Sequence, residues 1–244
     1  DTNGRTTSFT CNVMIDTTAP TVVINSPAEN EAVDTASYTI RGTADDGEGK
    51  GLSSIQYSVV DPEDAEESDW QTITKAAAWS KTGVDFSGDG QGEKTLWVRA
   101  SDGLNDAVIE SVSFQYDTEN PTLGETDINT TNTVAKKELF SLAVTAQDSN
   151  ALKSLKITQK KEDGTSLVIY EDNDLSGTEK TKNIYGLPKK LDNGDLVPVA
   201  IDGTEDGIYS YQILATDITG KEASLTRTVR FDTIGPKIEL DAFT

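Results

Sequence analysis

One short pattern occurs three times in this chain, and its spacing limits what the chain can fold into. Alternating apolar residues lead to Asp-Thr, two further residues and Pro in VMIDTTAPTVVI, FQYDTENPTLG and VRFDTIGPKIEL. The three aspartates are Asp16, Asp117 and Asp232, which are 101 and 115 residues apart. A period of about 100 residues is the length of a small β-sandwich and is too long for one repeat of a solenoid. The pattern therefore predicts two complete units joined by short Asp-Thr-x-x-Pro linkers.

A second set of aspartates supports this division. Asp102 precedes Asp117 by the same interval that separates Asp217 from Asp232 and Asp1 from Asp16. The segments GTADDGEGKGLSSIQYSV and VTAQDSNALKSLKITQ also match each other in the same order. We therefore predict four parts: a terminal hairpin of a preceding domain in 1–16, complete domains in 17–117 and 118–232, and the first strand of a following domain in 233–244.

Strand patterns dominate both units, and no segment has a convincing helical period. Short stretches such as KTLWVRA, VSFQYD, LKITQ and TRTVRFD alternate in polarity and are rich in β-branched and aromatic residues. Turn signals such as Asp-Gly and Asn-Gly separate them. The fold predicted is all-β, with two tandem Ig-like antiparallel β-sandwich domains.

The alternation also assigns the two faces of each strand. Residues two apart share a face, so Val112, Phe114 and Tyr116 are predicted to point into the core. By the repeat, Cys11 takes the matching core position in the preceding unit. The same reasoning turns Trp97 outward, which makes it a weak candidate for ligand binding. Further positions predicted to face the core are Leu96, Val98, Ala100, Tyr211, Ile213, Ala215, Val229 and Phe231.

Composition then restricts the function. The chain has 42 acidic and 21 basic side chains, a formal net charge of −21, which argues against nucleic acid and anionic membranes as partners. It has no His, the commonest general base, and its single Cys excludes an intrachain disulfide. No apolar run is long enough to insert into a membrane as a helix. An acidic protein can collect cations, and Ca²⁺ is the cation best suited to carboxylate and carbonyl oxygens.

The residues at the linkers resemble a known class of repeat. ATDITGKEAS, VRFDTIGP and VMIDTTAPTVVINSP are similar to the tandem bacterial Ig-like repeats of large surface adhesins and biofilm-associated proteins. This resemblance covers essentially the whole chain and implies an extracellular or cell-surface location. It also implies that neighbouring Ig-like domains of the same longer chain are the partners, and that Ca²⁺ binds near some domain junctions. The chain departs from the usual motif at SDGLND, TDITGK, DTEN and DTIG, while keeping the aspartates.

The linker aspartates are expected to meet two loops at one end of each sandwich, because the chain enters an Ig-like domain at that end. We predict two Ca²⁺ sites that would fix the angle between successive domains, with Pro20, Pro121 and Pro236 stiffening the same linkers. The alternative is that these aspartates only form turns by accepting nearby backbone N–H groups. The predicted ligands are Asp16, Asp45, Asp46 and Asp102 in the first unit, and Asp117, Asp148 and Asp217 in the second.

These observations favour a non-enzymatic spacer or stalk segment of a tandem-repeat surface protein. Three alternatives remain open at this point. The chain could be a recognition module for a host or matrix glycan or protein, an accessory region of a secreted hydrolase, or a fibre subunit that assembles by strand addition through residues 5–15.

Overall fold

The computed structural model describes residues 4, 6–126, 134–136 and 141–238. The chain divides into two units, residues 1–116 and 117–244, and strands make up most of the regular structure of both. Residues 6–20 contain no strand or helix, and Cys11 is exposed. The assignment of residues 1–16 and 233–244 to neighbouring domains stays a prediction, and residues 239–244 lie outside the described part.

The first unit is a sandwich of two sheets whose inward side chains form one core. The smaller sheet has the order β1-β3-β6 and the larger has the order β2-β8-β7-β4-β5. The elements are β1 (Thr21–Ser26), β2 (Ala32–Val33), β3 (Tyr38–Asp45), β4 (Ser54–Ser58), β5 (Gln71–Ile73), β6 (Ala78–Val84), β7 (Gly92–Ser101) and β8 (Val108–Tyr116), with short 3₁₀ helices at Glu67–Asp69 and Ser87–Asp89.

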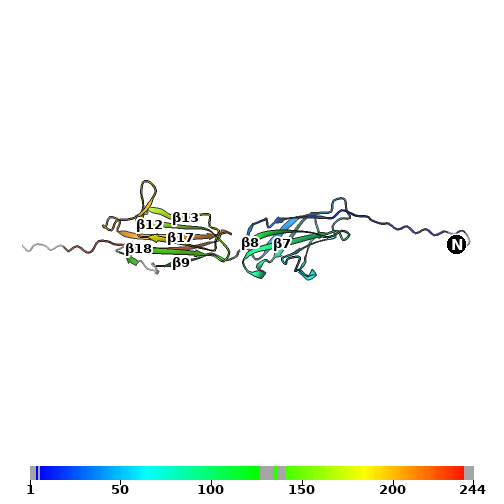
Figure 1. The fold of residues 1–244 in the computed structure, drawn as a ribbon, viewed down its shortest axis with the longest axis horizontal. Coiled ribbons are helices and arrows are strands. Elements are labelled where there is room, and N and C mark those ends of the chain that lie inside the picture. Colours follow the sequence, from blue (N-terminus) through cyan, green and yellow to red (C-terminus); the bar gives the residue numbers. More distant parts are fainter. Residues whose placement is uncertain (1–3, 5, 127–133, 137–140, 239–244) are drawn as a thin grey trace, which may run out of the picture. The chain divides into compact units, whose positions relative to one another are not determined.

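The second unit repeats this topology strand for strand, with sheet orders β9-β11-β14 and β10-β18-β17-β12-β13. It adds a small hairpin, β15-β16, between β14 and β17. Figure 1 labels β9, β12, β13, β17 and β18 of this unit. The strands are β9 (Thr122–Thr126), β10 (Val134–Lys136), β11 (Ser141–Gln147), β12 (Leu152–Lys161), β13 (Ser166–Asp172), β14 (Glu179–Tyr185), β15 (Pro188–Lys190), β16 (Leu196–Pro198), β17 (Gly207–Asp217) and β18 (Glu222–Phe231).

Most strand pairs are antiparallel, as predicted, but each unit also has one short parallel pair. β2 runs parallel to β8, and β10 runs parallel to β18. These pairs add a short strand beside the last strand of each sandwich. The sequence pattern did not reveal them because β2 and β10 are too short to show a period.

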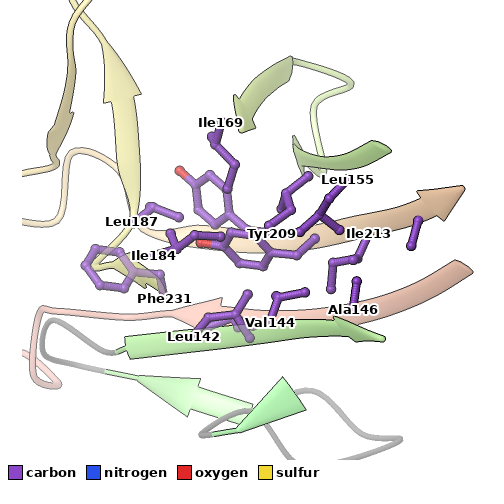
Figure 2. Packing of buried hydrophobic residues seen from close by; sticks show 14 of the residues in the cluster. Leu142, Val144, Ala146, Leu155, Ile169, Ile184, Leu187, Tyr209, Ile213 and Phe231 are labelled. Carbon is purple, nitrogen blue, oxygen red and sulfur yellow. The ribbon is translucent and has the colours of Figure 1, made fainter. Parts of the chain in front are cut away.

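The predicted alternation of core positions is confirmed in both units. Leu96, Val98 and Ala100 of β7 and Phe114 of β8 are fully buried, and Tyr211 and Ala215 of β17 are as well. Figure 2 shows the second core, where Leu142, Val144 and Ala146 from one sheet face Tyr209 and Ile213 from the other. Since two sheets supply each core, both units are Ig-like sandwiches.

Trp79 shows how closely the first core is packed. It lies opposite Gly42 in the pairing of β3 with β6, and it is 2% exposed. A Cβ at Gly42 would overlap the Trp79 ring and the carbonyl oxygen of Val23. Glycine is therefore needed at this position because the indole and the neighbouring strand fill the space that a side chain would take.

Gly42→Ala is expected to lower the free energy of unfolding of the first unit by about 1–3 kcal/mol, because backbone and indole must both move. Gly124→Ala is the matched control in β9 of the second unit, since the nearest atom to its Cβ would be the Thr145 carbonyl oxygen at 3.9 Å. Calorimetric unfolding of the full chain measures both variants. Equal stability of Gly42→Ala and the parent chain would contradict this account of the packing.

Candidate metal centres

Each unit brings together three aspartates from the linker and two loops. In the first unit these are Asp16 before β1, Asp46 after β3 and Asp102 after β7. In the second, Asp117, Asp148 and Asp217 occupy the equivalent places before β9, after β11 and at the end of β17. Within each group, one carboxylate oxygen of every residue lies within 4.8 Å of the others. The topology produces this because the linker and both loops lie at the same end of each sandwich.

In the first unit, most of the carboxylate oxygens accept hydrogen bonds. Asp16 accepts from the backbone N–H of Thr18 at 3.0 Å and of Lys50 at 2.6 Å. Asp102 accepts from the backbone N–H of Leu104 at 2.8 Å and, through its other oxygen, from Nδ2 of Asn105 at 2.7 Å. Oδ1 of Asp46 is buried and has no hydrogen-bond partner among the described residues.

In the second unit, the two oxygens of each aspartate have different surroundings. Oδ1 of Asp117 accepts from Glu119 N–H at 3.0 Å, Oδ1 of Asp148 accepts from Asn150 N–H at 2.8 Å, and Oδ1 of Asp217 accepts from Thr219 N–H at 2.8 Å. Oδ2 of all three residues is buried and has no hydrogen-bond partner among the described residues. The same side chains thus form turns with one oxygen and leave the other available.

The arrangement of these oxygens suits a calcium ion. Ca²⁺ binds 6–8 oxygens at 2.3–2.6 Å, so two ligands on opposite sides of the ion are about 5 Å apart. Since the ligand atoms of each group lie within 4.8 Å of one another, one ion could contact all three. Asp117 and Asp217 are 0% exposed and Asp148 is 8% exposed, so three carboxylates share a space with little access to water. Burying carboxylates without a compensating charge or hydrogen bond is costly, and a cation removes that cost.

Two of the aspartates have clearly shifted pKa values. The Asn105 side chain and the backbone N–H groups of Leu104 and Asn105 lower the pKa of Asp102 to about 2. Burial raises the pKa of Asp117 to about 6, and the charges of Asp148 and Asp217 add to this effect. The second group therefore contains a carboxylate that gains a proton near neutral pH when no cation is bound.

Lys221 contributes to the second group in a way that sequence reasoning missed. Its ammonium donates to the backbone carbonyl oxygen of Asp117 at 2.8 Å and to Oγ1 of Thr219 at 3.0 Å. In the first unit, Nδ2 of Asn105 makes the corresponding contact with the carbonyl oxygen of Thr18 at 3.0 Å. The sequence signal for these contacts was the departure from the usual motif at SDGLND and TDITGK, which contain Asn105 and Lys221.

The structure does not bring Asp45 into the first group. Asp45 is the last residue of β3 and is exposed, and its Oδ1 accepts from Gly47 N–H at 3.2 Å. Neighbouring residues of a strand point to opposite faces, so Asp46 turns inward where Asp45 turns out. Each group consequently has three aspartates. The prediction had given the first unit one more carboxylate than the second.

Trp97, the weak ligand-binding candidate, is half-buried in β7 and faces neither core, as predicted. Its neighbours across the sheet are Ser58 and Ser111. It is not among the residues that line three well-formed cavities in the described part of the chain. Trp70 and Trp79 are buried, and the guanidinium of Arg99 lies 4.3 Å from the centre of the Trp70 ring.

Within the described residues, no helix is long and apolar enough to span a membrane. No family model matches the chain, and the curated proteins contain no match.

Several solved structures resemble the chain. One is a tetra-tandem repeat in the extending region of a large adhesion protein, with 17% identity over 88% of this chain and a TM-score of 0.41. Others are Sidekick-1 immunoglobulin domains 1–4 (13% identity, 88% of this chain and 49% of that chain, TM-score 0.44) and DIP-gamma IG1+IG2 (10%, 87% and 97%, TM-score 0.41). This chain covers 50% of the adhesion-protein structure.

Proposed function

We propose that the chain is a non-enzymatic spacer segment of a tandem-repeat surface protein, in which Ca²⁺ bound by the two aspartate groups makes the linkers rigid. The observation that carries the cation site is the set of three buried, unpartnered Oδ2 atoms in the second unit. A group that served only to form turns would need one oxygen of each aspartate and would gain nothing from burying the other.

The residues present account for how a cation would act on the linker. Asp16 and Asp117 belong to the linkers, while Asp46, Asp102, Asp148 and Asp217 belong to loops of the following domain. An ion held by both would fasten the linker to that domain. Pro20 and Pro121 are buried just beyond the linker aspartates and fix the backbone angle φ there. Backbone carbonyls and water would complete the coordination shell.

The location and partners of this proposal follow from the resemblance to adhesin repeats. We propose an extracellular, cell-surface protein in which other Ig-like domains of the same chain precede and follow this segment. A stalk of this kind works by keeping successive domains aligned, and the cation would serve that role by limiting movement at each linker.

Calcium should raise the melting temperature of the chain. At a concentration about 100 times the Kd, binding to the folded state alone adds about 2.7 kcal/mol of stability. Asp217→Asn should remove most of the gain in the second unit, because the amide keeps an oxygen for the turn and loses the charge. Asp45→Asn is the matched control outside the group. Differential scanning calorimetry with Ca²⁺ and with a chelator tests this, and equal melting temperatures in both would refute the calcium proposal.

Protons should compete with the cation at Asp117. Its pKa is 3.8 ordinarily and about 6 in the folded chain. The folded state therefore binds the proton more tightly, and this gain in stability is full below about pH 4 and is lost as the pH rises through 6. In cation-free buffer, the stability of the parent chain relative to Asp117→Asn should fall between pH 4.5 and 7. Saturating Ca²⁺ should abolish that fall, because the ion then stabilises the carboxylate.

Urea unfolding at several pH values measures the Asp117 effect, and parallel pH profiles for the two chains would rule it out. Asp45→Asn is the control for a general effect of charge, because it changes the net charge equally at an exposed position. Its pH profile should parallel that of the parent chain.

The spacer role predicts a narrower distribution of distances between the two units when Ca²⁺ is present. Spin labels at Glu110→Cys and Lys153→Cys, both exposed positions, place one probe in each unit on a Cys11→Ser background. Pulsed electron paramagnetic resonance should give a broad distribution of label-to-label distances in cation-free buffer and a narrower one with Ca²⁺. If calcium binds and the distance distribution does not change, the proposed cation site stands and its proposed mechanical role is contradicted.

A further inference from the structure

The second unit has an insertion that the first unit lacks. β6 and β14 begin at the same offset from their linker aspartates, Asp16 and Asp117. The next long strand then follows after residues 85–91 in the first unit and after residues 186–206 in the second. The connection in the second unit is therefore longer. Its extra residues account for the whole difference between the Asp16–Asp117 and Asp117–Asp232 spacings. The insertion contains the β15-β16 hairpin.

A cavity of about 290 Å³ lies at the base of this hairpin, and we call it the hairpin pocket. It is lined from three segments of the second unit: the end of β12 with the start of β13, the β15 strand, and the residues around β17. The apolar part of the wall includes Leu167, Leu187 and Val199. Leu187 is fully buried and packs in the core near Ile184 (Figure 2), so the hairpin is anchored in the sandwich.

One side of the hairpin pocket is a fixed polar wall. The ammonium of Lys161 pairs with Oε2 of Glu205 at 3.2 Å. The hydroxyl of Tyr209 donates to the backbone carbonyl oxygen of Glu205 at 2.8 Å. These contacts hold the side chains in place before any ligand arrives, which lowers the entropy that binding would cost.

Two further lysines line the hairpin pocket without an ion pair of their own. Lys189 and Lys190 belong to β15 and are exposed, and neither comes within 4 Å of a carboxylate oxygen among the described residues. The charge of Lys189 does act on Asp202, whose pKa is lowered mainly by hydrogen bonds from Thr204. In a chain with a net charge of −21, two such ammonium groups at one cavity are a local departure from the overall charge. They favour a ligand that carries a negative charge.

Gln159 provides a buried hydrogen-bond acceptor, whereas the two lysines provide donors. It lines the hairpin pocket and is only 7% exposed. Its Nε2 donates to the Pro188 carbonyl oxygen at 3.1 Å, while its Oε1 has no hydrogen-bond partner among the described residues. A buried acceptor of this kind gains from a ligand that donates a hydrogen bond.

We propose that the hairpin pocket binds an anionic saccharide unit of the hexuronate class. A uronate offers a carboxylate to the ammonium of Lys189 or Lys190, which as neighbours in β15 point to opposite faces. It also offers hydroxyl groups that donate to Gln159 or Glu205, and a face of C–H groups for the aliphatic wall. The pocket volume is at the small end of the range for ligand sites, about 300–1,000 Å³, and suits one or two sugar rings. The polar groups converge on one small cavity, which favours a ring over an extended peptide.

Titration of the full chain with a trimer of galacturonate tests this proposal. The titration uses cation-free buffer, because uronates bind Ca²⁺ themselves and the aspartate groups would otherwise interfere. Chemical shifts of ¹⁵N-labelled protein should change at residues of the hairpin pocket, and calorimetry should give the affinity. A neutral galactose trimer should bind at least about tenfold more weakly, since charge-assisted hydrogen bonds are lost.

Two variants identify the residues responsible. Lys189→Gln with Lys190→Gln should weaken galacturonate binding about tenfold or more. Lys81→Gln with Lys153→Gln changes the net charge equally, away from the pocket, and should leave the affinity unchanged. Replacing residues 186–206 by residues 85–91 should abolish binding. Because Leu187 and Val199 are core residues, that replacement also needs a circular dichroism check of folding.

Three results would overturn the proposal: no shift changes at millimolar galacturonate, equal binding of the neutral trimer, or binding of a short acidic peptide in place of the saccharide. The aspartate groups share no residue with the hairpin pocket. The calcium proposal can therefore fail or hold independently of this one.

Discussion

The two oxygens of a single carboxylate have separate tasks in the second unit, and the organisation of the linker end depends on this separation. One oxygen accepts backbone N–H groups and sets the turn. The other is buried beside its counterparts and has no hydrogen-bond partner among the described residues. Turn formation and cation binding, which the sequence presented as alternatives, are therefore compatible in the same side chain. The turn holds the carboxylate in place and leaves its second oxygen buried with no hydrogen-bond partner among the described residues.

In the two units, different side chains donate hydrogen bonds to the aspartate group and the linker. In the first, the amide of Asn105 donates to Oδ2 of Asp102 and to a linker carbonyl oxygen. In the second, the ammonium of Lys221 donates to the linker carbonyl oxygen of Asp117. The three Oδ2 atoms of that unit, including the equivalent Oδ2 of Asp217, have no hydrogen-bond partner among the described residues. The second group therefore has more oxygen available to an ion, although its loop sequence offers fewer carboxylates.

The sequence predicted the fold well because both features behind it are periodic. Alternation along strands identified Phe114 and Tyr211 as core residues, and the spacing of Asp16 and Asp117 identified the units. The aspartate groups were predicted for the same reason, since a sandwich of known topology places these loops together. Asp45 was included, although it lies outside the group in the structure, because a turn sequence does not tell which of two adjacent carboxylates faces inward. The hairpin pocket could not be predicted, because it is formed by segments that meet only in the folded unit.

The position of the insertion has a consequence for how such repeats can diverge. The strands of the sandwich run from one end to the other, and the aspartate group lies where β17 ends, while the insertion lies where β17 begins. At that second end, both oxygens of Asp206 accept from the Thr233 N–H at 3.0 Å, so the insertion is also fastened to the chain leaving the unit. A domain built this way has one end under strict geometric constraint and one end free to lengthen. Repeats of this architecture can therefore acquire individual surfaces while keeping the same three aspartates at the linker end.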